Sequence, residues 1–184
     1  MNKTIKFIVI SLWVVLTRVY DTYATYQFTP DLSQEANPLV SILGFSWSPL
    51  LVTILGLSIW VIYCFFKATF SSHKPIPEET NYNFSNFIGY IYTGEKQKWF
   101  SILYKLPSSF NRFNLIMGHL LTRCLVFAGM ISTTMWLLLN HTEFYKEIHS
   151  PYLIYSILVI GGVVICHHWF STQFKRYNTC NKNM

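Results

Sequence analysis

The stretch from 113 to 139, FNLIMGHLLTRCLVFAGMISTTMWLLL, is the clearest sign of a membrane fold, because Arg123 is the single charged residue among its 27 positions. A helix of this length rises about 40 Å, whereas the hydrocarbon core of a bilayer is about 30 Å thick. Three further apolar segments, 5–28, 38–66 and 152–170, also come close to the roughly 20 residues that a crossing needs. The sequence therefore predicts an all-α integral membrane bundle of four transmembrane helices, with Pro49 kinking the second one.

The overall composition supports the same class. The chain has 184 residues, of which 52% are hydrophobic and 12% charged, and its mean hydropathy is +0.31. Soluble domains carry roughly 25% charged residues. We therefore expect residues 1–184 to form a single membrane domain without a separate soluble part.

Basic residues are distributed very unevenly between the two sides of such a bundle. If the N-terminus lies inside, the termini and the loop 67–112 carry eleven Lys and Arg residues, whereas the outer loops carry only Lys146. Cytoplasmic loops of membrane proteins are enriched in Lys and Arg. The sequence thus predicts a multi-pass protein of the bacterial inner membrane with both termini cytoplasmic. This orientation also accounts for the net charge of +6 without a nucleic-acid ligand.

The loop 67–112 is long and interleaves aromatic side chains with lysines. Such a stretch is typical of segments that lie in the lipid headgroup plane, so we expect one or two cytoplasmic interfacial helices here. Its candidate contacts to the membrane surface or to a partner are Lys96, Lys98, Trp99 and Lys105. A docking surface for a cytoplasmic protein or an RNA–protein complex is the alternative.

Polar side chains gather near the outer end of the first span. Arg18 and Asp21 are three residues apart, and Thr25 follows Asp21 by four, so all three can share one helix face. Glu35 and Asn37 precede Pro38, which suits a helix start with Asn37 as its N-cap. One interpretation is an ion pair plus a capped helix. The other is a site where Asp21 and Glu35 converge on a cation or a proton.

The pattern Asp21-x3-Thr25 followed by Glu35-x-Asn37-Pro38 resembles an uncharacterised family of small bacterial and archaeal multi-pass membrane proteins. In that family an Asp and a Thr on the first span precede Glu-x-Asn-Pro at the second. The resemblance covers Asp21 to Pro38, about a tenth of the chain. It implies a multi-pass membrane protein and no particular activity.

A second polar cluster is expected at the inner end. His119 and Arg123 lie four residues apart on the third span, and His167 and His168 lie near the end of the fourth. Polar contacts between helices explain these residues, with Arg123 reaching toward the headgroups. A metal site from His119 and a fourth-span histidine is an alternative. The spacing from Arg112 to His119 is also similar to the Arg-x6-His motif of HEPN-type ribonucleases.

Complete catalytic motifs are missing from the sequence: it contains no H-E-x-x-H, G-x-S-x-G or P-loop. The four cysteines form no C-x-x-C pair, so neither a disulfide framework nor a zinc site is indicated. We therefore expect no enzyme, no cofactor and no metal.

The function expected from the sequence is that of a non-enzymatic membrane protein. It would act by homo-oligomerisation, including pore formation, or by partner binding, with the bilayer as its first partner. Glycines on the third and fourth spans would permit close helix contacts. Two alternatives remain. One is an ion or proton transporter that uses Asp21 and Glu35. The other is a membrane accessory protein that modulates a type VI-B CRISPR RNA-targeting effector, which this chain resembles in size and layout.

Overall fold

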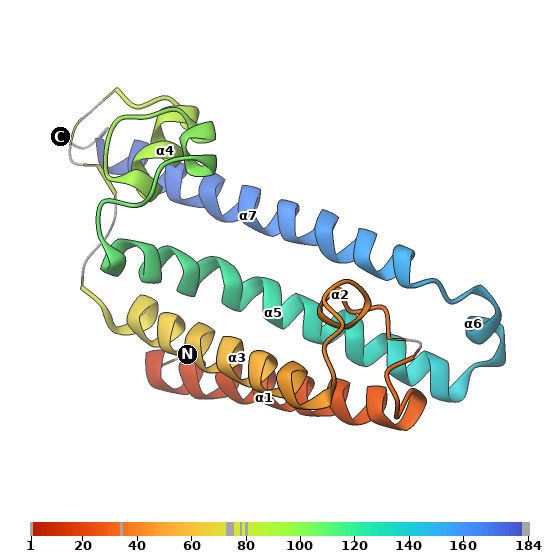
Figure 1. Ribbon diagram of the computed structural model, residues 1–184. Helices are drawn as coiled ribbons and strands as arrows, with labels where there is room; N and C mark the ends of the chain where they lie inside the picture. Colours follow the sequence, from red (N-terminus) through yellow and green to blue (C-terminus); the bar gives the residue numbers. More distant parts are fainter. Residues whose placement is uncertain (1, 34, 73–75, 78, 80, 182–184) are drawn as a thin grey trace.

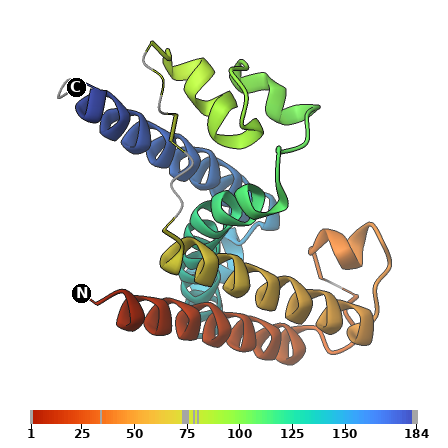
Figure 2. The same cartoon turned by 90° about the vertical axis from the view of Figure 1, so that its left-hand side faces the viewer.

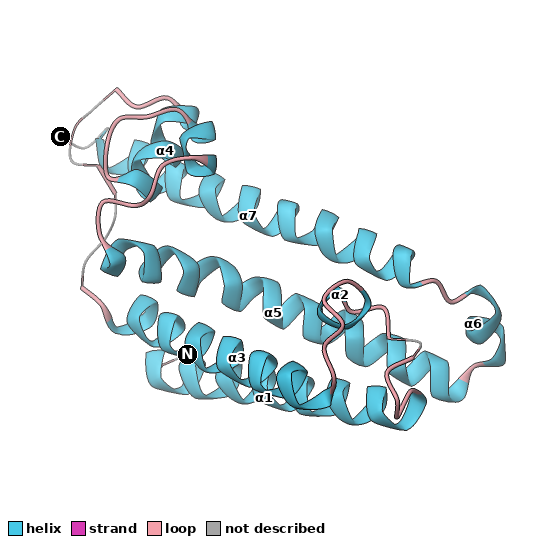
Figure 3. Ribbon diagram, in the orientation of Figure 1, coloured by secondary structure: helices cyan, strands magenta, loops and turns pink. Residues whose placement is uncertain are grey.

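The computed structural model describes residues 2–33, 35–72, 76–77, 79 and 81–181. Within these ranges 79% of the residues are helical and none lies in a strand (Figure 3). In chain order the elements are α1 (Lys3–Phe28), α2 (Pro38–Ser41), α3 (Trp47–Phe70), α4 (Phe84–Thr93), the 3-10 helix η1 (Trp99–Leu103), α5 (Phe110–His141), α6 (Glu143–Ile148) and α7 (Pro151–Asn181).

The four long helices form a bundle around α5. In Figure 1, α5 lies between α7 on one side and the pair of α1 and α3 on the other, and it contacts all three. Two glycines of α5 allow this close packing. A Cβ atom at Gly118 would collide with the backbone carbonyl of Cys64 in α3, and one at Gly129 would collide with Thr17 in α1. The bundle therefore depends on small residues where helices touch.

Three helices are long and apolar enough to cross a membrane, namely α3, α5 and the 151–180 part of α7, which indicates a membrane protein. The helix α1 has the length expected for the first span but is not among these three. Its sequence is interrupted by Lys6, Arg18 and Asp21.

The segment 38–66, expected to be one kinked helix, is divided in the structure. The short helix α2 ends at Ser41, and Gly44 adopts a positive φ of 67° before α3 begins at Trp47. Left-handed backbone of this kind suits glycine and stops a helix. Pro49 consequently lies in the first turn of α3, where proline is tolerated, so the expected kink does not arise.

The segment 67–112 folds against the ends of two long helices. Residues 81–108, which include α4 and η1, pack on the start of α5 and the end of α7, and we call this part the α4 unit. Figure 2 shows it beside the C-terminal end of α7 and far from α1. Its core and the adjoining helices share eight buried side chains: Tyr82, Phe87, Ile91, Ile116, Leu120, Trp169, Phe170 and Tyr177.

The last helix is much longer than the expected span 152–170. It continues to Asn181, and the added turns carry Tyr177 into the α4 unit. The Tyr177 hydroxyl donates a hydrogen bond to the Glu79 carbonyl at 2.9 Å and accepts one from the Tyr82 backbone N–H at 3.2 Å. The residues after 170 therefore belong to this packed extension of α7.

Candidate functional site

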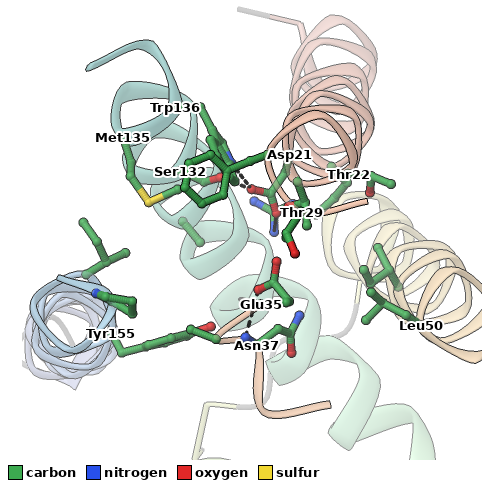
Figure 4. A pocket seen from close by; sticks show the side chains of 18 of the residues that line it. Asp21, Thr22, Thr29, Glu35, Asn37, Leu50, Ser132, Met135, Trp136 and Tyr155 are labelled. Carbon is green, nitrogen blue, oxygen red and sulfur yellow. Dashed lines mark hydrogen bonds and ion pairs between the residues drawn. The ribbon is translucent and has the colours of Figure 1, made fainter. Parts of the chain in front are cut away.

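A cavity of about 260 Å³ lies at the end of the bundle opposite the α4 unit. Residues from α1, α2, α3, α5 and α7 line it, together with the linker between α1 and α2 (Figure 4). Its apolar walls include Leu50, Ile54 and Leu158. Its polar and indole lining comprises Arg18, Asp21, Thr22, Thr25, Thr29, Glu35, Asn37, Trp47, Ser132, Trp136, His149 and Tyr155.

Asp21 connects α1 to α5 within this cavity. One carboxylate oxygen, Oδ1, accepts a hydrogen bond from the Trp136 indole N–H at 2.9 Å and another from the Ser132 hydroxyl. The other oxygen, Oδ2, lies 3.5 Å from Nη1 of Arg18, one turn earlier on α1. The ion pair expected between Arg18 and Asp21 is therefore present, and two donors on α5 accompany it.

Glu35 enters the same cavity from the linker. Its carboxylate accepts the backbone N–H of Asn37 at 2.8 Å, and the Asn37 side chain caps α2 by accepting the N–H of Leu39 at 3.0 Å. Figure 4 shows Glu35 and Asp21 directed toward the same interior, with the Tyr155 ring beside Glu35. Burial raises the pKa of Glu35, and the charge of Asp21 adds to this effect, whereas the Asn37 N–H opposes it.

The linker is held in place by bonds to α3. The Trp47 indole N–H donates to the Pro30 carbonyl at 2.7 Å, and the Trp47 ring packs edge-on against Tyr26. Within the linker, Asp31 accepts the Ser33 backbone N–H at 3.1 Å. These contacts hold the chain that carries Glu35 across the end of the bundle.

One cationic side chain and two carboxylates line the cavity: Arg18, Asp21 and Glu35. Arg18 uses Nη1 for Asp21, while its Nε and Nη2 are buried and have no hydrogen-bond partner among the described residues. His149 also lines the cavity, and burial lowers its pKa, which favours the neutral imidazole. With both carboxylates ionised, the cavity carries a net charge of −1, and Glu35 is the carboxylate without a basic partner in the described chain.

All five residues of the outer cluster expected from the sequence line this cavity: Arg18, Asp21, Thr25, Glu35 and Asn37. Sequence reasoning missed Ser132 and Trp136 of α5, His149 between α6 and α7, and Tyr155 at the start of α7. Ser132 and Trp136 are four residues apart on a helix, so their hydrogen-bond donors lie on one face, which was a usable signal. His149 and Tyr155 had no such signal, because the carboxylates that share the cavity with them, Asp21 and Glu35, lie more than a hundred residues earlier.

The inner cluster is dispersed. Arg112 donates from Nη1 to the carbonyls of Tyr90 and Ile91 at 2.8 and 3.0 Å, so its guanidinium binds the C-terminal end of α4. His119 instead packs against Trp169 with ring centroids 5.6 Å apart. The Arg-x6-His spacing therefore does not produce a shared Arg112 and His119 site.

Neither of the fourth-span histidines is the ring partner of His119, which is Trp169. His167 packs edge-on against Phe84 at 5.9 Å, and the side chains of His167 and His168 are exposed. Arg123 donates from Nη1 to the carbonyl of His119 at 3.0 Å. Throughout the described ranges, no group of three His, Cys, Asp or Glu side chains could hold a metal ion.

The four candidate contact residues of the loop lie on the α4 unit. Lys96 lies over the Tyr82 ring at 5.0 Å, and Lys105 pairs with Glu95 at 3.3 Å. Lys98 and Trp99 are exposed, and the apolar side chains of Leu103 and Leu106 are more than 80% exposed. The α4 unit thus presents both cationic and apolar groups on its surface.

Comparisons with protein-family models, with curated proteins and with solved structures give no match for this chain.

Proposed function

We propose that the chain is a non-enzymatic, multi-pass protein of the bacterial inner membrane that binds a small organic cation carrying one positive charge. The observation that supports this proposal is that Asp21 of α1 and Glu35 of the linker line one cavity. Fourteen residues separate them in sequence. The fold brings them together while giving a basic partner to only one of them.

The chemistry of the cavity favours an alkylammonium group over a metal ion. A metal ion would require several oxygen ligands, but the Asp21 carboxylate already accepts bonds from Arg18, Ser132 and Trp136. Glu35 alone can supply one unpaired negative charge. Aromatic rings of Trp136 and Tyr155 line the same space and can face a cation through their π systems. The volume of about 260 Å³ suits a small molecule.

The proposed membrane placement includes α1 as a fourth span and both ends of the chain in the cytoplasm. The excess of Lys and Arg on that side supports this orientation. The cavity then opens near the outer surface. The α4 unit lies at the cytoplasmic surface, where Trp99, Leu103 and Lys98 suit the headgroup region.

A thermal-shift titration of the full chain in a mild detergent tests cation binding, with propylammonium and tetramethylammonium as probes. The expected result is a saturable rise in Tm for the wild type. Glu35→Gln should abolish this rise, because the single unpaired negative charge is gone. Glu147→Gln is the matched control, since Glu147 is exposed and does not line the cavity. A rise that persists in Glu35→Gln, or no rise in the wild type, would contradict the proposal.

We also propose that the chain forms a homo-oligomer through α7. The observation is that α7 is poorly covered: Val159, Ile160, Val163 and Val164 are each about 60% exposed or more. A Cβ atom added at Gly162 on the same helix would meet no atom within 4 Å. The helix surface at Gly162 is therefore uncovered within a single chain, and a second copy could approach it closely. Light scattering with the detergent mass subtracted should give a multimer. Gly162→Leu should shift it toward the monomer, and a monomeric wild type would rule this out.

A further inference from the structure

Three buried nitrogen atoms of residues that line the acidic cavity have no hydrogen-bond partner among the described residues. Within the described ranges, seven buried side-chain nitrogen and oxygen atoms are unpaired, and the nitrogens among them are Nε and Nη2 of Arg18 and Nδ1 of His149. Both residues line the cavity. Buried polar groups of folded proteins are almost always hydrogen-bonded. Unpaired groups around a cavity therefore indicate what chemistry that cavity can bind.

The unpaired nitrogens of Arg18 form one edge of its guanidinium group. Nη1 donates to Asp21 at 3.5 Å, whereas Nε and Nη2 lie on the side of the group that matches the two oxygens of one carboxylate. Because a guanidinium has five N–H donors, Arg18 can bind a second carboxylate and keep its contact with Asp21. The Arg18 side chain is 21% exposed, so a small rotation of this flexible side chain brings the unpaired edge to a ligand in the cavity.

His149 adds the third unpaired nitrogen, from the short connection between α6 and α7. A neutral imidazole nitrogen donates or accepts one hydrogen bond, depending on the tautomer. Nδ1 can therefore donate to a carboxylate or accept from an ammonium group. The imidazole thus suits a ligand that carries both kinds of group.

Glu35 gives the same cavity an unpaired negative group. Its carboxylate accepts the Asn37 backbone N–H at 2.8 Å and has no basic partner among the described residues. A ligand with only a positive group leaves the edge of Arg18 unpaired. A ligand with only a negative group is repelled by Asp21 and Glu35. A ligand with one group of each sign satisfies both Arg18 and Glu35.

From this arrangement we propose that the cavity binds a small zwitterion that carries one ammonium group and one carboxylate, as an amino acid does. The ammonium group lies at Glu35, and the carboxylate accepts from Nε and Nη2 of Arg18. The cavity volume of about 260 Å³ suits an amino acid with a short carbon chain. This inference deepens the proposed function and rests on it, because Glu35 is the group that binds the positive charge.

Three ligands with the same three-carbon chain test the inference in thermal-shift titrations of the full chain in a mild detergent. β-Alanine carries both charged groups, propylammonium only the positive one and propanoate only the negative one. The wild type should bind β-alanine about tenfold more tightly than propylammonium, because the carboxylate adds two charge-assisted hydrogen bonds. Propanoate should give no saturable rise in Tm.

Variants of Arg18 show whether this residue causes the preference. Arg18→Gln should bind β-alanine and propylammonium within about twofold of each other, because the two-donor edge is gone. Arg123→Gln is the matched control and should keep the preference, since Arg123 is exposed and does not line the cavity. Arg18→Lys serves if Arg18→Gln does not fold. It keeps the positive charge beside Asp21 and should reduce the preference to about threefold, because lysine has no two-donor edge.

The outcomes separate this inference from the proposed function. Equal binding of β-alanine and propylammonium by the wild type would overturn the zwitterion and leave cation binding in place. An undiminished preference in a folded Arg18 variant would also overturn the zwitterion. If neither ligand binds the wild type, the proposed function fails and the zwitterion fails with it.

Discussion

Replacement of Asp21 by asparagine tests whether the acidic cavity is held together by its polar bonds. Asp21 accepts bonds from Trp136 and Ser132 on α5 and from Arg18 on its own helix. Asparagine has only one carbonyl oxygen, so when that oxygen accepts from the α5 donors, the amide N–H₂ faces Arg18. The change therefore weakens the link between α1 and α5 and leaves the Arg18 guanidinium without its counter-charge.

The magnitudes of these contacts rank the three partners. The side chains of Arg18 and Asp21 are 21% and 30% exposed and 3.5 Å apart, so their ion pair contributes only about 1 kcal/mol or less. Hydrogen bonds to a charged group contribute about 1.5–3 kcal/mol each, and a neutral acceptor roughly halves that. The expected loss in the free energy of unfolding is therefore about 3 kcal/mol for Asp21→Asn. It is about 2 kcal/mol for Trp136→Phe and about 1 kcal/mol for Arg18→Gln.

Thermal unfolding in detergent, followed by tryptophan fluorescence or by cysteine labelling, measures this ranking. At about 2–4 °C per kcal/mol for a chain of this size, Asp21→Asn should lower Tm by roughly 6–12 °C. The cysteine readout serves best for Trp136→Phe, which also changes the fluorescence. If Arg18→Gln lowers Tm more than Trp136→Phe does, the ion pair dominates and the reasoning is wrong. A Tm for Asp21→Asn within one degree of the wild type would refute it entirely.

Three further outcomes follow from the structure. Burial raises the pKa of Glu35, so ionisation of this carboxyl destabilises the folded state as pH rises. Glu35→Gln should therefore increase Tm at neutral pH. This gain should vanish below about pH 4, where the carboxyl is protonated in both the folded and the unfolded state. Gly118→Ala should cost about 1–3 kcal/mol in unfolding assays, because its Cβ would meet the Cys64 carbonyl, whereas Gly162→Ala should be neutral or stabilising by up to about 1 kcal/mol. Reporter fusions at Asp31 and at the C-terminal end of α7 should report opposite compartments, and a shared compartment would disprove the proposed orientation.

The sequence predicted the long helices well because their signal is local. Apolar composition over about 20 residues is sufficient for α5 and for the main part of α7. The break at Gly44 was harder, since residues 38–66 contain no charged side chain, and the positive φ of this glycine between α2 and α3 is not evident from the sequence. The α4 unit was missed as a packed body, because Phe87 and Ile91 find their partners on α7, about 80–90 residues later.

The candidate site, like the fold, was predictable where its residues are close in sequence. Asp21 and Glu35 share a short stretch of sequence, and their spacing with Asn37 already indicated one cluster. The Trp136 indole N–H comes from α5 and the Tyr155 ring comes from α7. No local sequence pattern specifies how these two helices pack in the bundle. The interpretation as an ion pair and the interpretation as a cation site also proved compatible, since Arg18 neutralises Asp21 and leaves Glu35 free of a basic partner among the described residues.

The dependence of the α4 unit on Tyr177 has a consequence for the order of events on the ribosome. Phe87 is synthesised 90 residues before Tyr177, which takes roughly 5 to 18 s at bacterial and eukaryotic translation rates of about 5–20 residues per second. Throughout this interval the aromatic side chains of α4 lack the part of their core that α7 supplies. Nascent chains that stall before the last helix therefore display an unfinished aromatic surface, by which proteases and chaperones can distinguish them from completed protein.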